Sequence, residues 1–228
     1  MIGTSGMRGH RRTSISTWRK VRGAIFVIAV ALAMVSCVKP PHPPALDHSA
    51  PSFGVQNAVI LLIRHAEKPA SGKGLSSEGE EHAQTYVPLF SDYQIGARHL
   101  KVEALFAAAD SPESARPRLT LTPLSQSLKL PINTSFLAKN YDGLAHHLLT
   151  SEFSGKTVVV CWKHGEMMHL AAALGVEAAA LPSAAHWPSS WPDNQFGWVL
   201  QISYDDSGKI DVTNTCCITP PARRARRK

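Results

Sequence analysis

The architecture of this protein follows from the run Ala58-Val59-Ile60-Leu61-Leu62-Ile63-Arg64-His65. Its first six residues are apolar and mostly branched, and polar residues and Pro69 follow within a few positions. A short, continuous run of this kind is typical of a strand buried on both faces of a sheet. Arg64 and His65 then lie where the strand ends, and in open α/β sheets ligands bind at this carboxyl end.

The other predicted elements alternate between strands and helices. The pattern predicts strands at 102–107, 130–132 and 157–162, helices at 75–90, 117–128, 141–149 and 166–174, and a hairpin with arms at 196–204 and 209–212. Pro123 lies inside the second helix and must either be tolerated there or divide it. The alternation predicts an α/β fold, a three-layer α/β/α sandwich with a mostly parallel sheet and an antiparallel edge hairpin.

The net charge of +7 comes from the two ends of the chain. Of the 24 basic residues, six lie in residues 1–37 and five in residues 223–228, and neither segment contains an acid. Residues 38–222 therefore hold 13 basic and 17 acidic residues, a net charge of −4. A mildly acidic domain does not favour nucleic acid as a partner.

Residues 1–36 are predicted to be a signal peptide. Six basic residues precede an uncharged apolar run from 24 to 36, which is too short to span a bilayer comfortably. The run ends in Ala33-Met34-Val35-Ser36-Cys37, which resembles the cleavage site of a bacterial lipoprotein, where the cysteine is lipidated. An ordinary cleaved signal and an uncleaved anchor remain open as alternatives.

The lipoprotein resemblance implies a protein of the cell envelope, held to the membrane on the periplasmic side by lipid on Cys37. Residues 37–53 would be the lipidated cysteine and a semi-rigid linker, because five prolines lie between 40 and 51. We expect the folded domain at 54–218 and a disordered basic tail at 219–228. The other cysteines fit no zinc pattern: Cys161 is expected to be a buried hydrophobe, and Cys216 and Cys217 to be structural or intermolecular.

Two of the predicted strands end in a basic residue followed by a histidine, Arg64-His65 and Lys163-His164. If both strands are central in the sheet, both imidazoles face one crevice, and Arg116 before the second helix adds another guanidinium. Arginine binds phosphate through a planar, bidentate fork, so this set predicts a site for a dianion. One neutral histidine could attack phosphorus, while the other, protonated, stabilises the oxygens of the transition state.

Four segments, in order, resemble motifs of the histidine phosphatase superfamily, also called phosphoglycerate mutase-like. They are Val59-Ile60-Leu61-Leu62-Ile63-Arg64-His65-Ala66-Glu67-Lys68, Gly74-Leu75-Ser76-Ser77-Glu78-Gly79, Arg116-Pro117-Arg118-Leu119-Thr120-Leu121-Thr122-Pro123-Leu124 and Val158-Val159-Val160-Cys161-Trp162-Lys163-His164-Gly165. The resemblance implies that His65 accepts the phosphoryl group, that Arg64 and Arg116 bind its oxygens, and that His164 is the second catalytic histidine. It implies no metal and no cofactor. Arg118 is a rival to Arg116, since it also precedes a threonine by four residues.

The proton donor is the part of the resemblance that this chain does not match. Many members carry a glutamate motif between the second arginine and the second histidine, but residues 131–155 hold only two acids, both expected to be exposed. Glu166, two residues after His164, is a candidate donor, and Asp110 and Glu113 are others. A general acid contributes about 10²–10⁴-fold. Without one, the enzyme would prefer phosphoanhydrides or phosphohistidine, whose leaving groups depart easily.

The leading prediction is a metal-independent phosphatase that hydrolyses phosphomonoesters or phosphoanhydrides through a phosphohistidine intermediate on His65. Its partners would be a phosphorylated small molecule and, through the lipid anchor, a membrane. The alternative is a catalytically weak or inactive envelope lipoprotein that binds phosphorylated ligands. A mutase is a third option, disfavoured by the missing glutamate motif and by the exported location.

Overall fold

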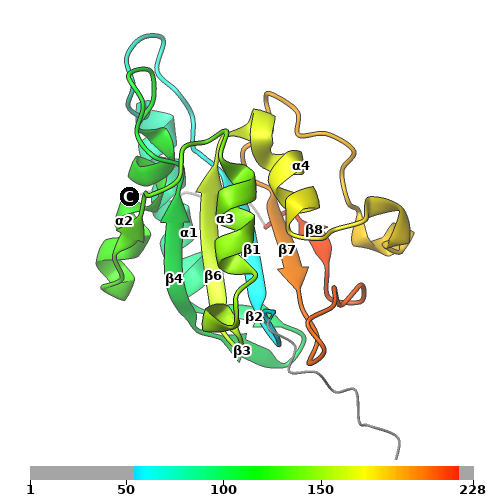
Figure 1. The fold of residues 1–228 in the computed structure, drawn as a ribbon. Helices are drawn as coiled ribbons and strands as arrows, with labels where there is room; N and C mark the ends of the chain where they lie inside the picture. The colour runs from blue at the N-terminus through cyan, green and yellow to red at the C-terminus, as the bar shows by residue number, and fades with distance from the viewer. Residues whose placement is uncertain (1–53, 221–228) are drawn as a thin grey trace, which may run out of the picture. The chain divides into compact units, whose positions relative to one another are not determined.

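The computed structural model describes residues 54–220, whose centre is a six-stranded mixed sheet (Figure 1). The strands of this sheet are β1 (Val59–Arg64), β4 (Val102–Ala107), β5 (Ile132–Asn133), β6 (Thr157–Trp162), β7 (Val199–Ser203) and β8 (Cys216–Ile218). Their order across the sheet is β5-β4-β6-β1-β7-β8. The first four strands in this order are parallel, whereas β7 is antiparallel to β1 and β8 is antiparallel to β7.

The central position of β1 explains its continuous apolar run. It pairs in parallel with β6, with Arg64 opposite Trp162, and antiparallel with β7. All six of its residues are buried. Because β1 and β6 are parallel neighbours, their carboxyl ends lie side by side, and each strand is followed there by one of the two histidines predicted for the site.

Helices cover both faces of the sheet, which confirms the predicted three-layer α/β/α architecture. They are α1 (Ser77–Ser91), α2 (Arg116–Leu128), α3 (Tyr141–Leu148) and α4 (His164–Ala173), with the short 3₁₀ helices η1 (Ser151–Phe153), η2 (Ala178–Ala180) and η3 (Ser183–Ala185). Along β1, Ile60 and Leu62 join one hydrophobic cluster with α3 and α4, whereas Leu61 and Ile63 join a second with α1 and α2. Figure 1 shows α3 and α4 in front of the sheet.

The start of α1 is packed tightly against the loop that follows β1. The Ser76 hydroxyl caps the helix by accepting a hydrogen bond from the Gly79 N–H at 3.1 Å. Gly79 is required there, because a Cβ on this residue would clash with the carbonyl oxygen of Glu67. This contact helps to place the loop that carries His65 and Ala66.

Some boundaries differ from those predicted. β5 is Ile132–Asn133 instead of 130–132, and α4 begins at His164, two residues earlier than predicted. Pro123 does not divide α2, which is continuous. The hairpin of β2 (Tyr93–Ile95) and β3 (Arg98–Leu100) was not predicted, since its strands are short and mostly exposed.

The prediction of residues 209–212 as the return arm of the edge hairpin is wrong. β7 pairs instead with β8, and only an isolated bridge joins Tyr204 to Ile210. The carboxylate of Asp205 accepts hydrogen bonds from two backbone N–H groups of the turn, and the carboxylate of Asp211 accepts two more. These local turns compete with strand pairing and delay the return of the chain to the sheet.

The cysteines of the described part are free thiols. Cys161 is buried in β6, as predicted, and burial raises the pKa of its thiol. Cys216 and Cys217 are half-buried neighbours in β8. Successive side chains of a strand point to opposite faces, so these two thiols are not placed to bridge each other.

The predicted signal peptide, the lipidation site Cys37 and the linker up to residue 53 lie outside the described residues, as does nearly all of the basic tail. The described residues belong to the second of two units of the chain, Asp47–Lys228. Within 54–220, the helices are all too short or too polar to cross a membrane.

Candidate active site

Arg64, the last residue of β1, is buried and held by a loop from the far end of the chain. Its Nη1 donates hydrogen bonds to the carbonyl oxygens of Pro192 at 3.1 Å, Asp193 at 2.6 Å and Gln195 at 3.0 Å. The guanidinium carbon also lies 3.8 Å from the centre of the Phe196 ring. The segment 192–196 therefore fixes the orientation of the guanidinium, with a cation–π contact on one face.

His65 directly follows β1 and is buried, since only 6% of the residue is exposed. Its backbone N–H donates to the Trp162 carbonyl of β6, and its Nδ1 lies 2.8 Å from the Ala66 carbonyl oxygen. A carbonyl can only accept, so we assign the ring proton to Nδ1, which leaves the lone pair on Nε2. Nε2 makes no hydrogen bond within the described residues.

The electrostatic surroundings of His65 favour the neutral ring. Burial is the main cause that lowers the pKa of His65 to about 4, and the positive charges of Arg116 and Arg64 lower it further, against the opposing effect of the bond to Ala66. At neutral pH the imidazole therefore carries no proton on Nε2. A nucleophilic nitrogen requires that state.

His164 is the first residue of α4, and its ring centre lies 6.3 Å from that of His65. The structure therefore brings together the two histidines predicted from the strand ends. His164 Nε2 lies 2.8 Å from the carboxylate oxygen Oδ1 of Asp193. Burial and the charge of Arg64 lower the pKa of His164, and Asp193 opposes them. The lowered pKa favours a neutral His164 in the free protein at neutral pH. The protonated ring expected from the sequence belongs to the transition state and stays a prediction.

Arg116 is the first residue of α2, and the structure explains the threonine four residues later. The Thr120 hydroxyl donates to the Arg116 carbonyl at 2.8 Å and accepts from the Ala66 N–H at 2.9 Å. Thr120 therefore ties the start of α2 to the loop of His65. The Arg116 side chain has one long hydrogen bond, from Nη1 to the Glu113 carbonyl at 3.4 Å.

The rival arginine, Arg118, is engaged elsewhere. Its guanidinium forms a bidentate ion pair with Asp110, with Nη2 2.6 Å from Oδ2. Only Arg116 of these two arginines contributes to lowering the pKa of His65. The geometry thus favours Arg116 over Arg118 as the second phosphate-binding residue, although its role in binding remains a prediction.

None of the three acids considered from the sequence contacts either histidine. Asp110 is paired with Arg118, and the Glu113 carboxylate accepts a hydrogen bond from Ser111. Glu166 is half-buried on α4, and its carboxylate makes no hydrogen bond or ion pair with residues 54–220. Sequence reasoning missed Asp193, since no local motif relates it to residues about 30 and 130 positions earlier in the chain.

Three buried nitrogen atoms of the site lack a hydrogen-bond partner. Among residues 54–220, the buried side-chain nitrogen and oxygen atoms without a hydrogen bond are Arg64 Nε, Arg116 Nε and His164 Nδ1. Buried polar groups in native proteins normally have a partner, because an unmade hydrogen bond costs about 1–3 kcal/mol. An acceptor with several oxygens would match the Nε–H groups of the two arginines, and also His164 Nδ1 when that nitrogen carries a proton. The amino end of α4 adds partial positive charge beside His164.

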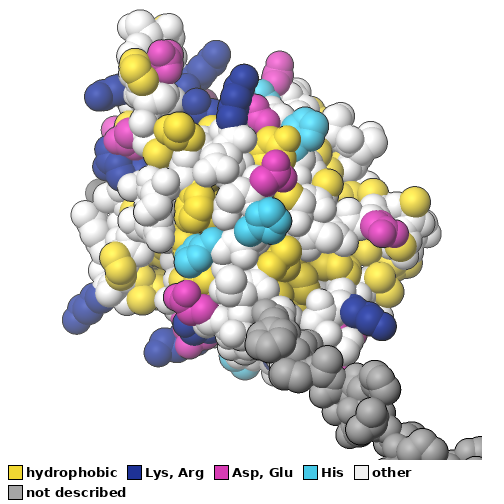
Figure 2. Space-filling view, viewed as in Figure 1, with side chains coloured by type: hydrophobic (Ala, Val, Ile, Leu, Met, Phe, Trp, Pro, Cys, Tyr) yellow, Lys and Arg dark blue, Asp and Glu magenta, His cyan; other side chains and the backbone are white. Residues whose placement is uncertain are grey.

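The mouth of the site carries charges of both signs. Figure 2 shows Lys and Arg side chains gathered at the upper end of the molecule, over the loops that follow β1 and β4 in Figure 1, with acidic side chains among them. Lys68 is one of the charges that lower the pKa of His164, whereas Asp193 raises it. Within 54–220, no group of three His, Cys, Asp or Glu side chains is arranged to hold a metal ion.

No family model and no curated protein matches the chain. The solved structures similar to it include provisionally assigned phosphohistidine phosphatases SixA from Agrobacterium tumefaciens (16% identity, TM-score 0.42, covering 65% of this chain and 93% of that chain) and from Nakamurella multipartitia (11%, 0.42, 71% and 93%). Phosphoglycerate mutase from Bacillus anthracis is another (11%, 0.41, 70% and 92%).

Proposed function

We propose that this protein is a phosphatase that hydrolyses phosphomonoesters or phosphoanhydrides, without a metal ion, through a phosphohistidine intermediate on His65. The observation that carries the proposal is the set of unpartnered buried nitrogens on Arg64, Arg116 and His164, gathered around a neutral His65. A phosphoryl group supplies acceptor oxygens for the Nε–H groups of both arginines, and for His164 Nδ1 when that nitrogen carries a proton. Its phosphorus is also the electrophile that a neutral imidazole attacks.

In the proposed reaction His65 Nε2 attacks phosphorus while the bond to the leaving group breaks. Arg64 and Arg116 bind the phosphoryl oxygens, and their charge stabilises the negative charge that spreads over those oxygens in the transition state. Bound phosphate also favours protonation of His164, since an opposite charge nearby stabilises the imidazolium. Water then attacks the phosphohistidine and releases phosphate.

The test compares His65→Ala with the wild type on 4-nitrophenyl phosphate in the presence of EDTA, using purified full-length protein in detergent. We expect turnover by the wild type and loss of at least about 10³-fold in His65→Ala, because the nucleophile is gone. Brief reaction with a ³²P-labelled ester should label the wild type with acid-labile, base-stable phosphate. His146→Ala is the matched control, since His146 is an exposed histidine on α3.

Unchanged turnover in His65→Ala would contradict the proposal, and so would loss of wild-type activity in EDTA. The alternative prediction, an inactive lipoprotein that binds phosphorylated ligands, expects a different result. Phosphate would raise the melting temperature of the wild type, but none of the esters would turn over.

The cellular location is proposed from the sequence alone. A lipid on Cys37 would hold the enzyme at the periplasmic side of the cell envelope, with residues 37–53 as the linker and residues 1–36 removed as a signal peptide. The natural substrate would then be a phosphorylated small molecule of that compartment. Metabolic labelling with radioactive palmitate tests this location, and equal labelling of the wild type and Cys37→Ser would contradict it.

A further inference from the structure

Asp193 lies at the proposed site, although no motif in the sequence marks it. Its Oδ1 is 2.8 Å from His164 Nε2, and no other carboxylate among the described residues contacts either of the two histidines. Its own backbone carbonyl accepts the 2.6 Å hydrogen bond from Arg64. One residue thus touches both a phosphate-binding arginine and the second histidine.

The position of this carboxylate is held by its neighbours in the chain. Arg64 also binds the carbonyl oxygens of Pro192 and Gln195, on either side of Asp193. The indole N–H of the buried Trp191 donates to the same Gln195 carbonyl at 2.6 Å. These hydrogen bonds fix the backbone on both sides of Asp193, so its carboxylate can move only by rotation about the side-chain bonds.

Burial changes sharply across the site. Arg64 and His65 are 5% and 6% exposed, whereas the side chain of His164 is 34% exposed and that of Asp193 is 94% exposed. A phosphoryl group held by Arg64 and attacked by His65 lies at the buried end. In an in-line displacement the leaving oxygen is opposite the nucleophile, away from the buried end, and Asp193 is the exposed carboxylate beside His164.

We propose that Asp193 is the proton donor to the leaving group in the phosphatase reaction proposed above, on which this inference rests. It fills the role for which the sequence offered Glu166, Asp110 and Glu113. A phosphate dianion bound beside the pair of His164 and Asp193 favours uptake of one proton by the pair, and when that proton lies on the carboxyl group His164 is neutral. A neutral carboxyl group is the form that can donate a proton.

The proton balance closes over the two steps. In the first step, the bond from His65 Nε2 to phosphorus forms as the bond to the ester oxygen breaks, and the carboxyl proton of Asp193 moves to that oxygen. In the second step, water oxygen bonds to phosphorus as the bond to His65 breaks, and the water proton moves to the Asp193 carboxylate. An alcohol and phosphate are the products, and both side chains return to their starting states.

The test is a series of phosphate esters whose alcohols differ in acidity: 4-nitrophenyl, phenyl and ethyl phosphate. Asp193→Asn keeps the shape of the side chain and the backbone carbonyl, so we expect the melting temperature to stay unchanged. It should lose about 10²–10⁴-fold in kcat/KM on ethyl phosphate and only a few-fold on 4-nitrophenyl phosphate, whose leaving group needs no proton. Asp193→Glu should restore part of the ethyl phosphate activity.

Controls separate this role from its rivals. Asp206→Asn removes an exposed acid of the turn after β7 and should leave all three rates unchanged. An equal loss on all esters in Asp193→Asn would overturn the inference, since it would mean that Asp193 only positions His164. An equal gain would also overturn it, because the carboxylate would then merely compete with phosphate.

A leaving-group-dependent loss in Glu166→Gln but not in Asp193→Asn would give the donor role to Glu166. Failure of the proposed function looks different. A wild type that hydrolyses none of the esters, or a His65→Ala variant that hydrolyses them normally, would remove both proposals. If activity depends on His65, but the wild type and Asp193→Asn show the same dependence on the leaving group, only the inference about Asp193 is overturned.

Discussion

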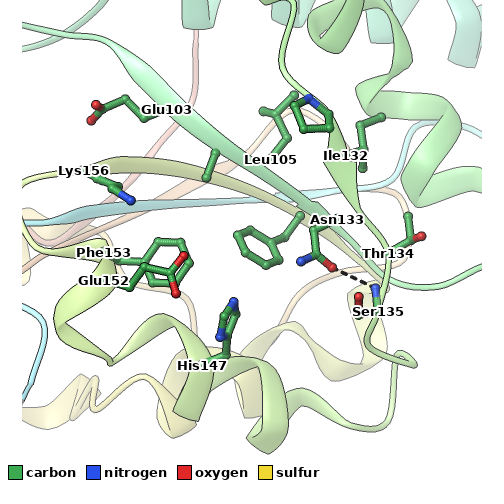
Figure 3. A pocket seen from close by; sticks show the side chains of 13 residues that line it. Glu103, Leu105, Ile132, Asn133, Thr134, Ser135, His147, Glu152, Phe153 and Lys156 are labelled. Atoms are coloured by element: carbon green, nitrogen blue, oxygen red, sulfur yellow. Dashed lines mark hydrogen bonds between the residues drawn. The ribbon is translucent and has the colours of Figure 1, made fainter.

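Two polar regions of this molecule differ in whether their buried polar groups have hydrogen-bond partners. One is the site at the carboxyl ends of β1 and β6, where buried donors have no acceptor. The other is a cavity of about 560 Å³ beside the β4–β5 edge (Figure 3). Its polar lining includes Glu103, Asn133, His147, Glu152 and Lys156. Neither His65 nor His164 lines this cavity.

The cavity has a structural origin. β5 pairs only two of its residues with β4, at Leu105 and Phe106, so the edge of β4 before them is uncovered. The polar groups nearby are satisfied or open to solvent: Asn133 accepts a hydrogen bond from the Ser135 N–H, and Lys156 lies over the Phe153 ring at 5.4 Å. Figure 3 shows these side chains around the hollow. The volume of this cavity follows from a short strand, whereas the site at the ends of β1 and β6 has buried nitrogen atoms that only a ligand can bind.

The largest effect that separates the two regions is expected at the arginines. Arg116→Lys should lower kcat/KM on 4-nitrophenyl phosphate by about 10²–10³-fold, because an ammonium cannot reproduce a fork of two donors to a phosphoryl group. The melting temperature should change little, since Arg116 makes only one long hydrogen bond. Activity and melting curves on the same preparations check both parts.

Arg64→Lys is expected to differ from Arg116→Lys in its effect on stability, because Arg64 also has a structural role. The change removes a guanidinium that binds three carbonyl oxygens and lies over Phe196, so we expect a loss of roughly 1.5–3 kcal/mol in unfolding free energy as well as a loss of activity. Full activity in Arg116→Lys would show that the unpartnered Arg116 Nε does not mark a phosphate site.

A smaller effect is expected from the titration of His65. Burial, with help from the nearby arginines, lowers the pKa of His65 to about 4 in the folded protein, against 6.5 for an ordinary histidine. Between these values the unfolded chain binds a proton that the folded chain does not, so stability falls as pH falls. From pH 7 to pH 4.5 this should remove about 2 kcal/mol of unfolding free energy.

Urea unfolding of the wild type and His65→Asn at both pH values measures this difference. The other titrating groups are common to the two proteins, so the contribution of His65 is the change that the variant lacks. Identical pH dependence in the two proteins would show that His65 is not held neutral by burial. The comparison between the two regions would then lose its electrostatic basis.

The parts of the fold that sequence could predict are those that local pattern determines. The branched apolar runs of β1 and β6 predicted both strands, because only a strand covered on both faces uses such a run. Parallel neighbours then bring His65 and His164 to one edge of the sheet. The predicted meeting of the two rings therefore rested on strand order, which the pairing of β1 with β6 supplies.

The parts that sequence could not predict depend on distant or competing contacts. Asp193 and Phe196 reach Arg64 from about 130 residues away, through a loop whose local pattern gives no sign of its destination. β8 begins after two turns closed by aspartate side chains, so the return arm is displaced along the chain. The starting residue of α4 shows the same limit, since a two-residue shift moves His164 from a loop to the amino end of a helix.

The smallest effect is expected at the cavity, and it is the sharpest test of the comparison. Glu103 and Glu152 are exposed acids of its lining, outside the recorded contacts of the two histidines. The double variant Glu103→Gln/Glu152→Gln should change kcat/KM on 4-nitrophenyl phosphate by less than about two-fold and unfolding free energy by about 0.5 kcal/mol or less, the usual range for surface substitutions. A ten-fold loss of activity without a change in melting temperature would mean that substrate or product occupies the cavity. The site would then extend along β4 to the sheet edge. The cavity would mark a part of the site that the unpartnered buried nitrogens do not reveal.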